Sequence, residues 1–361
     1  MSKNKIKIAG AGVSGLISAI KLKDAGYNVV VYDKASDSGE RFSNDFQGIE
    51  NWVYKQDVLD FLEELNIDTD FYYMEGNEME IWTSENKCNE IEFKRPLFYL
   101  IKRGTEENCL DQALKKQALS RGIEIKYNHP VEPEEVDIVA TGPLLKDSDI
   151  DGLVAGYTFD TNLEDSCIMI MDDEYAYNGY SYFLVSEGKA TLASCIFGNY
   201  EKANEYREKT LKFYKERIDF EMENIEEFSG TGNFFLPEIP DDKKIYIGEA
   251  GGFQDYLWGF GIRYAIKSGY YAAQSIIENE DFYKLCEEDI YPKMRNSVTN
   301  RMLYMIFNNN IYSWLIRVHD LIIKDKIKYA RKIYQSSWYK RFLFFFSKRA
   351  LGDNIKDPRD L

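Results

Sequence analysis

Histidine and cysteine are scarce in this chain of 361 residues, and both shortages limit the chemistry of its side chains. The two histidines, His129 and His319, support neither a histidine-rich metal site nor a Ser-His-Asp triad. The five cysteines form no C-x-x-C pair, so we expect free thiols, a reducing compartment and no iron–sulfur cluster. We expect no metal site, and we expect a bound cofactor to supply the chemistry of an enzyme built this way.

Long apolar runs are also missing. No stretch of about 18 apolar residues occurs, so no segment is expected to cross a bilayer. The first ten residues, MSKNKIKIAG, lack the apolar core and the small-residue cleavage site of a signal peptide. We expect a cytoplasmic protein, with peripheral membrane association as an open alternative.

The net charge of −16 is distributed unevenly. Residues 291–361 carry 15 Lys/Arg against 5 Asp/Glu, a net charge of +10, so residues 1–290 carry −26. The acidic body argues against nucleic-acid binding. Within the basic part, the segment YKRFLFFFSKRA (339–350) places Lys and Arg around aromatic residues. This pattern suits an anionic membrane surface, or equally a helix whose basic face packs on the acidic body.

The N-terminal sequence KIKIAGAGVSGLISAIKLKDAGYNVVVYD has the pattern of a strand, a glycine turn, a helix and a second strand. Gly10, Gly12 and Gly15 match the G-x-G-x-x-G motif at the turn. These glycines permit a tight turn, close approach of the backbone to a pyrophosphate, and packing of the helix on the strand. Asp33 follows the second strand, where an acid binds ribose hydroxyls. The pattern predicts a dinucleotide site.

The remaining sequence predicts alternating helices and strands. We expect helices over 56–67 and 108–121, a hairpin within 79–96, and a second hairpin over 180–197 that turns at SEGK. Residues 201–227 predict a charged helix, and aromatic, basic helices follow residue 291.

Three further segments favour FAD over a nicotinamide dinucleotide. YDKASDSGER (32–41) and DIVATG (137–142) are similar to the second and third motifs of FAD proteins of the glutathione-reductase type. The late segment IYIGEAGG (245–252) is similar to the motif in which an acid, here Glu249, accepts hydrogen bonds from the ribityl chain. The glycines at 251, 252, 259 and 261 would let backbone approach the flavin.

With these motifs the chain resembles the geranylgeranyl reductase family, flavoproteins of the p-hydroxybenzoate hydroxylase fold. The family motif G-D-A-A-G-F-x-x-P-x-x-G-x-G-I corresponds to Gly248–Ile262, with Glu249 for Asp and Tyr256 for Pro. The family Y-x-x-x-R element corresponds to Tyr99–Arg103, which implies that Arg103 lies near the flavin. The substrate signature P-x-x-Y-x-W-x-F-P corresponds to Tyr177–Val185 and matches at Tyr180, and the family Cys-Gly-Glu element is missing.

The motifs and the resemblance together give two sets of candidate site residues, and they assign no catalytic residue. The cofactor-binding candidates are Gly10, Gly12, Val13, Ser14, Gly15, Asp33, Lys34, Arg41, Arg103, Val131, Thr141, Gly142, Glu249, Gly259, Phe260, Gly261 and Ile262. The substrate-binding candidates are Tyr180, Tyr182, Tyr256 and Trp258. A proton donor is not identified; Tyr180 and Tyr256 are candidates.

The resemblance implies an FAD-dependent reductase that saturates double bonds of a lipophilic, polyprenyl substrate. NAD(P)H binding transiently, or a ferredoxin, would supply electrons, because no second G-x-G-x-x-G motif occurs. A monooxygenase of the same fold, an electron-transfer flavoprotein, and a flavoprotein that binds its cofactor without turnover remain alternatives. The W-x-W-x-I-P element of flavin halogenases is absent.

The expected fold is α/β, or α+β overall: a Rossmann-like FAD-binding domain, an inserted, mostly antiparallel β substrate domain, and a helical C-terminal region. We assign residues 1–50, 96–155 and 240–290 to the FAD-binding domain. Residues 51–95 and 156–239 form the substrate domain, and residues 291–361 form the basic, aromatic helical region.

Overall fold

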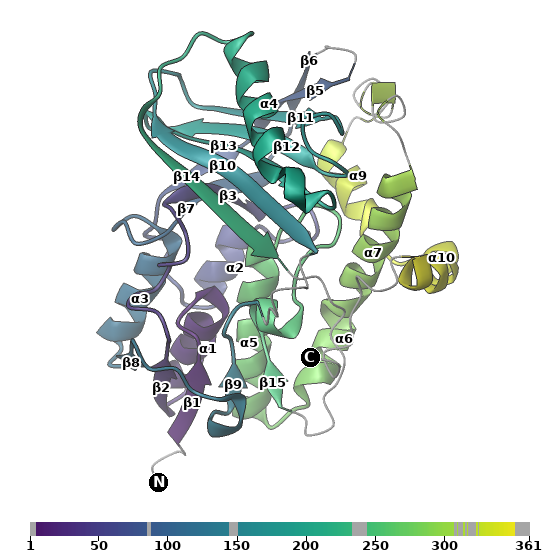
Figure 1. The fold of residues 1–361 in the computed structure, drawn as a ribbon. Helices are drawn as coiled ribbons and strands as arrows, with labels where there is room; N and C mark the ends of the chain where they lie inside the picture. The colour runs from purple at the N-terminus through teal and green to yellow at the C-terminus, as the bar shows by residue number, and fades with distance from the viewer. Residues whose placement is uncertain are drawn as a thin grey trace.

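The structure is a computed structural model that describes residues 5–84, 88–143, 151–232, 244–306, 309, 313–314, 316, 323 and 325–350, the side chains of 348–350 excepted. The described part of the chain contains three sheets, the helices α1 to α5, and a set of C-terminal helices (Figure 1). His319 lies outside the described residues.

The first sheet is parallel and forms the base of the molecule. Its strand order is β15 (Ile245–Tyr246), β9 (Ile138–Val139), β1 (Lys5–Ala9), β2 (Asn28–Tyr32) and β8 (Glu124–Lys126). β2 is buried from its second residue on, as a continuous apolar strand of a covered parallel sheet should be.

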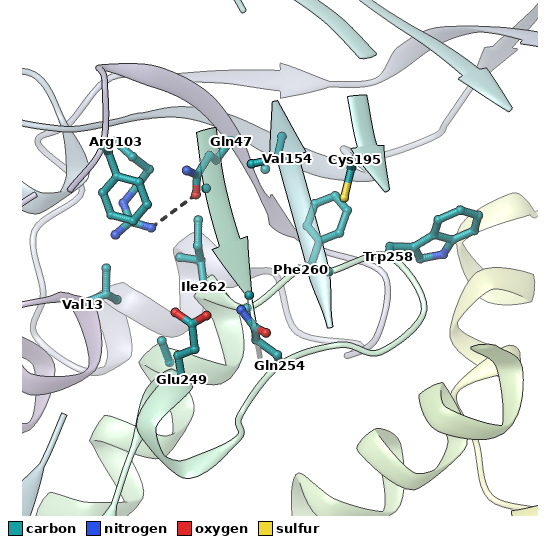
Figure 2. Close-up of a pocket in the computed structure, with 18 of the residues that line it drawn as sticks. Val13, Gln47, Arg103, Val154, Cys195, Glu249, Gln254, Trp258, Phe260 and Ile262 are labelled. Carbon is teal, nitrogen blue, oxygen red and sulfur yellow. Dashed lines mark hydrogen bonds between the residues drawn. The ribbon is translucent and has the colours of Figure 1, made fainter. Parts of the chain in front are cut away.

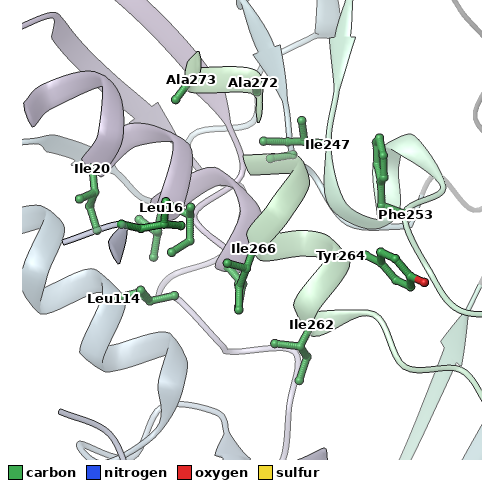
Figure 3. Close-up of a cluster of buried hydrophobic side chains, with 14 of the residues drawn as sticks. Leu16, Ile20, Leu114, Ile247, Phe253, Ile262, Tyr264, Ile266, Ala272 and Ala273 are labelled. Atoms are coloured by element: carbon green, nitrogen blue, oxygen red, sulfur yellow. The ribbon is translucent and has the colours of Figure 1, made fainter. Parts of the chain in front are cut away.

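Three helices pack beside this sheet. α1 (Val13–Asp24) contacts both α3 (Leu110–Ser120) and α5 (Ile262–Glu278). Leu16 and Ile20 of α1, Leu114 of α3 and Ile266 of α5 belong to one buried cluster (Figure 3). This core holds the N-termini of α1 and α5 at fixed positions beside the sheet.

A three-stranded antiparallel sheet follows, in the order β3 (Asp45–Glu50), β7 (Phe98–Arg103) and β4 (Tyr73–Gly76). The short helix α2 (Val58–Glu64) lies between β3 and β4 in the chain, and the Asp57 carboxylate caps it by accepting the Leu59 N–H.

The third sheet has seven strands. Their order is β14 (Glu223–Gly232), β10 (Gly152–Asp160), β13 (Lys189–Ile196), β12 (Tyr180–Ser186), β11 (Ser166–Met171), β5 (Glu78–Thr83) and β6 (Cys88–Glu92). All neighbours are antiparallel except β5 and β11. Both expected hairpins are confirmed; β12 and β13 turn at Glu187 and Gly188, which have positive φ.

The predicted helix over 201–227 is wrong in its second half. After the short 3-10 turn η2 (Tyr200–Lys202), helix α4 (Ala203–Lys215) ends and the chain enters β14 at Glu223. β14 pairs along most of its length with β10, which lies some 70 residues earlier. That pairing is non-local, and the charged local sequence carries no sign of it.

The described C-terminal helices are α6 (Phe282–Asp289), α7 (Tyr291–Ile306), α9 (Lys326–Ile333) and α10 (Trp338–Ala350). None of the helices in the described ranges is long and apolar enough to cross a membrane. The parallel sheet, the antiparallel sheets and these helices confirm the expected fold class, whereas the predicted domain boundaries stay a prediction.

Candidate functional site

The turn between β1 and α1 brings backbone close to backbone. Gly10 has φ +106°, and an added Cβ there would lie 2.1 Å from the Ala140 carbonyl oxygen. An added Cβ at Gly15 would lie 2.0 Å from the Gly10 carbonyl oxygen, so both positions require glycine. At Gly12, by contrast, a Cβ would meet no protein atom within 4 Å. Gly12 is the N-cap of α1 and faces open space, where the first N–H groups of the helix have no intrahelical partner.

Asp33 anchors this turn from the end of β2. Its carboxylate accepts the Ala11 N–H at 2.6 Å and the Ala35 N–H at 2.8 Å. Each carboxylate oxygen can accept a further hydrogen bond, so the side chain can hold the turn and bind a hydroxyl group at the same time.

Two ion pairs, each between an arginine and an acidic residue, lie near the glycine turn. Arg41 Nη1 lies 3.1 Å from Glu249 Oε2, which joins the loop after β2 to the 3-10 turn η3 (Gly248–Gly251). Arg103 is buried and makes a bidentate pair with Asp111, with Nε–Oδ2 at 2.7 Å and Nη2–Oδ1 at 2.9 Å. The Arg103 guanidinium also donates to Gln47 Oε1 at 3.5 Å (Figure 2).

The loop before α5 is held in one conformation by hydrogen bonds. Asp255 Oδ2 accepts the Trp258 N–H at 2.8 Å, and the Asp255 N–H donates to the Phe260 carbonyl at 2.8 Å. Tyr180 Oη donates to the Trp258 carbonyl at 2.6 Å, which ties the loop to β12. Burial raises the pKa of the Asp255 carboxyl to about 6.

A cavity of about 1,410 Å³ borders the glycine turn, Asp33, both ion pairs and the loop before α5. It is lined by sixteen of the cofactor-binding candidates and three of the substrate-binding candidates. They are Gly10, Gly12, Val13, Ser14, Asp33, Lys34, Arg41, Arg103, Val131, Thr141, Gly142, Glu249, Gly259, Phe260, Gly261, Ile262, Tyr180, Tyr182 and Trp258. The N-terminal glycine turn and the loop before α5, which are about 250 residues apart in the sequence, therefore line the same cavity.

Gly15 and Tyr256 lie outside this cavity, so the structure does not place them in contact with its contents. Gly15 packs α1 against the backbone of Gly10. Tyr256 is buried in the core cluster with Phe253 and Ile262, and its N–H donates to Ser297 Oγ. Its ring lies in the core and does not line the cavity, and contact between Tyr256 and substrate stays a prediction.

One wall of the cavity is a face of the seven-stranded sheet. Alternate residues of each strand point the same way, so β5, β11 and β12 each contribute every second side chain. These residues are Met79, Ile81, Cys167, Met169, Met171, Tyr180, Tyr182 and Leu184. The alternate set packs with Phe213 and Tyr214 of α4 and includes Phe183, Val185 and Ile168, of which Ile168 also borders the cavity. The cavity thus has a polar end at the glycine turn and an apolar wall on the sheet.

The sequence analysis missed several lining residues. Gln254 Oε1 is buried and has no hydrogen-bond partner among the described residues, and its place in the glycine-rich loop was the only available signal. Gln47, Val154 and Cys195 come from strands that carry no motif (Figure 2). Burial raises the pKa of the Cys195 thiol to about 12, so this thiol is protonated at neutral pH. All five cysteines are free, as expected.

The residues present fit an FAD molecule. The positive φ of Gly10 and the open space at Gly12 leave room for a pyrophosphate at the N-terminus of α1. Asp33 and Glu249 offer carboxylates for sugar and ribityl hydroxyls. Gln254 Oε1 is a buried acceptor available to a polar ligand edge.

Comparisons with known proteins agree on the fold. The family of NAD(P)-binding Rossmann-like domains matches residues 8–56. No curated protein sequence matches this chain significantly. A geranylgeranyl bacteriochlorophyll reductase-like structure from Thermoplasma acidophilum is 15% identical, with a TM-score of 0.70, over 98% of this chain and all of that one.

Two further structures are similar over nearly the whole chain. A flavin-dependent brominase is 12% identical, with a TM-score of 0.66, over 96% of this chain and 98% of that one. A 2-methyl-3-hydroxypyridine-5-carboxylic acid oxygenase is 15% identical, with a TM-score of 0.54, over 92% and 97%. The chain therefore has the fold shared by the geranylgeranyl reductase-like structure and the flavin-dependent brominase, which confirms the fold expected from its motifs.

Proposed function

We propose that this chain is an FAD-dependent oxidoreductase that reduces double bonds of a lipophilic, polyprenyl substrate. The observation that carries the proposal is the single cavity, which joins a dinucleotide cradle to an apolar wall. A cofactor bound at the polar end would lie next to an apolar substrate on the sheet side, with no barrier between them. When bound and reduced by an electron donor, FAD would supply two electrons as a hydride.

The protein groups around the cavity divide into two roles. Asp33, Glu249 and the first turn of α1 hold the cofactor by hydrogen bonds and by the helix dipole. The alternating side chains of β5, β11 and β12 bind an apolar chain and exclude water from the reacting bond. Phe260 packs against Gly48 of β3, where an added Cβ would lie 2.5 Å from its ring, and it brings the loop before α5 into contact with the three-stranded sheet.

Tyr182 is the proton donor that we favour. It lines the cavity, and no described residue bonds its hydroxyl. Its phenol carries a proton at neutral pH, so Oη has a proton to donate to the substrate; burial raises the pKa of this phenol, which makes it a weaker acid than a free tyrosine. The Tyr180 hydroxyl, in contrast, is occupied by the Trp258 carbonyl, so Tyr180 positions the loop.

The test is a single-turnover reaction. The FAD-loaded protein would be reduced without oxygen by dithionite and mixed with a geranylgeranyl lipid. We expect flavin absorbance to return and the lipid to gain two hydrogens for each reduced bond, as read by mass spectrometry. Reoxidation only after oxygen is admitted, with a hydroxylated product, would replace this proposal with a monooxygenase.

The electron donor is proposed on the same basis. NAD(P)H would bind transiently, or a ferredoxin would dock, since the dinucleotide cradle is assigned to FAD. Adding NADH, NADPH or reduced ferredoxin to the oxidised protein and following flavin bleaching distinguishes these donors.

A further inference from the structure

Helix α10 carries aromatic side chains on its outer side. Trp338, Phe342 and Phe345 have exposed fractions of 83%, 63% and 63%. Their spacing of four and three residues places them on one side of a helix. We call these three residues the aromatic stripe; Tyr339 and Phe346 lie beside it, each 48% exposed.

The opposite side of α10 packs on the protein. α10 contacts α7, and Figure 1 shows the two helices side by side at the edge of the molecule. Lys340 and Ser347 are buried, and Lys340 Nζ donates to the Ile333 carbonyl of α9. Because α7 and α9 hold the opposite side of α10, the aromatic stripe faces solvent. Covering these side chains with an apolar phase or partner would be favourable.

Basic side chains surround the stripe. Between residues 325 and 347 the chain has six Lys/Arg and one acid, Asp325. Lys328, Lys332 and Arg341 are exposed, and among the described residues none of them forms an ion pair. The sequence allowed this basic surface to pack on the acidic body, but these three charges face solvent. The side chains of Lys348 and Arg349 lie outside the described residues.

Helix α9 connects this surface to the cavity. Tyr329, Ala330 and Ile333 of α9 line the cavity, and Tyr329 is also 42% exposed. The same short helix carries Lys328 and Lys332 on its exposed side. A lipid held by this surface would therefore lie one helix away from the cavity.

We propose that α9 and α10 form a docking surface for an anionic lipid bilayer, with the aromatic stripe inserted at the interface and Lys328, Lys332 and Arg341 on lipid phosphates. Exposed aromatics beside lysine and arginine are typical of helices that lie in a membrane interface. A second copy of the chain fits less well, because a two-fold contact through this surface would bring its basic groups face to face. The inference concerns binding alone and does not depend on the proposed reaction.

The test is flotation of the full, FAD-loaded protein with lipid vesicles. We expect binding to vesicles of phosphatidylcholine with about 30% phosphatidylglycerol, and at least about tenfold weaker binding to pure phosphatidylcholine. Raising the salt from about 0.1 M to about 0.5 M should weaken binding to the anionic vesicles. Equal binding to both vesicles, or binding to neither, overturns the proposal.

Two sets of variants assign the effect to the surface. Trp338→Ser with Phe342→Ser and Phe345→Ser should lower vesicle binding at least about tenfold, because three interfacial side chains are lost. The matched control replaces Leu119, Ile225 and Ile277 with Ser; these apolar residues are 48%, 52% and 37% exposed elsewhere and should leave binding unchanged. Equal losses in both variants overturn the proposal.

Two further measurements test whether a second copy of the chain, and not a bilayer, covers the aromatic stripe, and whether each variant is folded. Light scattering without vesicles detects self-association, and a stripe variant that changes oligomeric state without changing vesicle binding identifies a second copy as the occupant and overturns the proposal. Flavin absorbance and circular dichroism show that each variant is folded and loaded. Loss of FAD binding would count against the proposed function, whereas the vesicle experiment would still test the docking proposal.

Discussion

Glycines 10 and 12 have different neighbours, and the difference gives a sharp prediction. Gly10→Ala would place a methyl group 2.1 Å from the Ala140 carbonyl oxygen at positive φ, so we expect destabilisation of at least about 2 kcal/mol. Gly12→Val places its side chain in open space, so we expect a change of less than about 1 kcal/mol in the apoprotein.

FAD titration completes this pair of variants. Gly12→Val should weaken FAD binding at least about tenfold, because the valine would occupy the pyrophosphate site. Chemical denaturation and fluorescence titration measure the two effects. An unchanged FAD affinity in Gly12→Val would show that nothing binds over this turn.

Tyr182 and Tyr180 test the proton donor. Tyr182→Phe removes the hydroxyl that we assign to proton transfer, so single-turnover reduction should slow about a hundredfold while FAD binding is unchanged. Tyr180→Phe removes the hydrogen bond to the Trp258 carbonyl, and its effect should fall mainly on substrate affinity. Equal rates for Tyr182→Phe and the wild-type protein would assign the proton to another group.

Glu50 makes stability depend on pH. This residue of β3 is fully buried, and burial raises the pKa of its carboxyl from 4.5 to about 7, although Arg263 acts in the opposite direction. Between these pH values the folded state binds the proton more tightly than the unfolded state, so stability is present at low pH and is lost as the pH rises.

Glu50→Gln should therefore flatten the pH dependence. The wild-type protein should lose on the order of 2 kcal/mol of unfolding free energy from this group between about pH 5 and about pH 8, and the variant should lose less. Denaturation at both pH values measures the difference, with the exposed Glu64→Gln as control. Parallel slopes in all three proteins would contradict the burial argument.

At the scale of elements, the crossing of α1 and α5 fixes the site. An added Cβ at Gly269 of α5 would lie 2.4 Å from the Ser14 carbonyl oxygen of α1. A backbone carbonyl cannot avoid the added methyl group by changing rotamer, so Gly269→Ala should destabilise the protein by about 2 kcal/mol. It should also lower FAD occupancy, because Ser14 lies in the first turn of α1. Thermal unfolding with and without FAD tests this. Glu278→Ala, exposed at the end of the same helix, should have little effect, and a stable Gly269→Ala would show that the helices can separate freely.

The elements that the sequence predicted well are those with local signals. The glycine turn, α1 and β2 follow from residues 5–33, and the hairpin turn at Glu187–Gly188 from its own four residues. β14 was mistaken for helix because its partner strand is distant in the sequence. Gln47 and Val154 were missed for the same reason: strands place them at the cavity, and no motif marks a strand face.

At the scale of the whole molecule, the cavity is the feature that local reasoning could not give. Its walls come from the parallel sheet, the three-stranded sheet, the seven-stranded sheet and α9, so its size and apolar character depend on how these parts assemble. Motif spacing and the family resemblance identified most of its polar end. Tyr256 shows the limit, because a motif position does not tell which way a side chain points.

Charge also acts at this scale. The sequence is acidic over residues 1–290 and basic over residues 291–361, and the exposed Lys328, Lys332 and Arg341 place part of the basic charge on the surface of α9 and α10. Such a distribution favours orientation at an anionic surface. Salt should therefore affect vesicle binding far more than it affects folding.

FAD binding is the claim on which the rest depends, and titration of the purified apoprotein tests it most directly. The account predicts stoichiometric binding of FAD with a shifted flavin spectrum, and clearly weaker binding in Asp33→Ala and Glu249→Ala. Failure of the wild-type protein to bind FAD, or full occupancy in both variants, would contradict it.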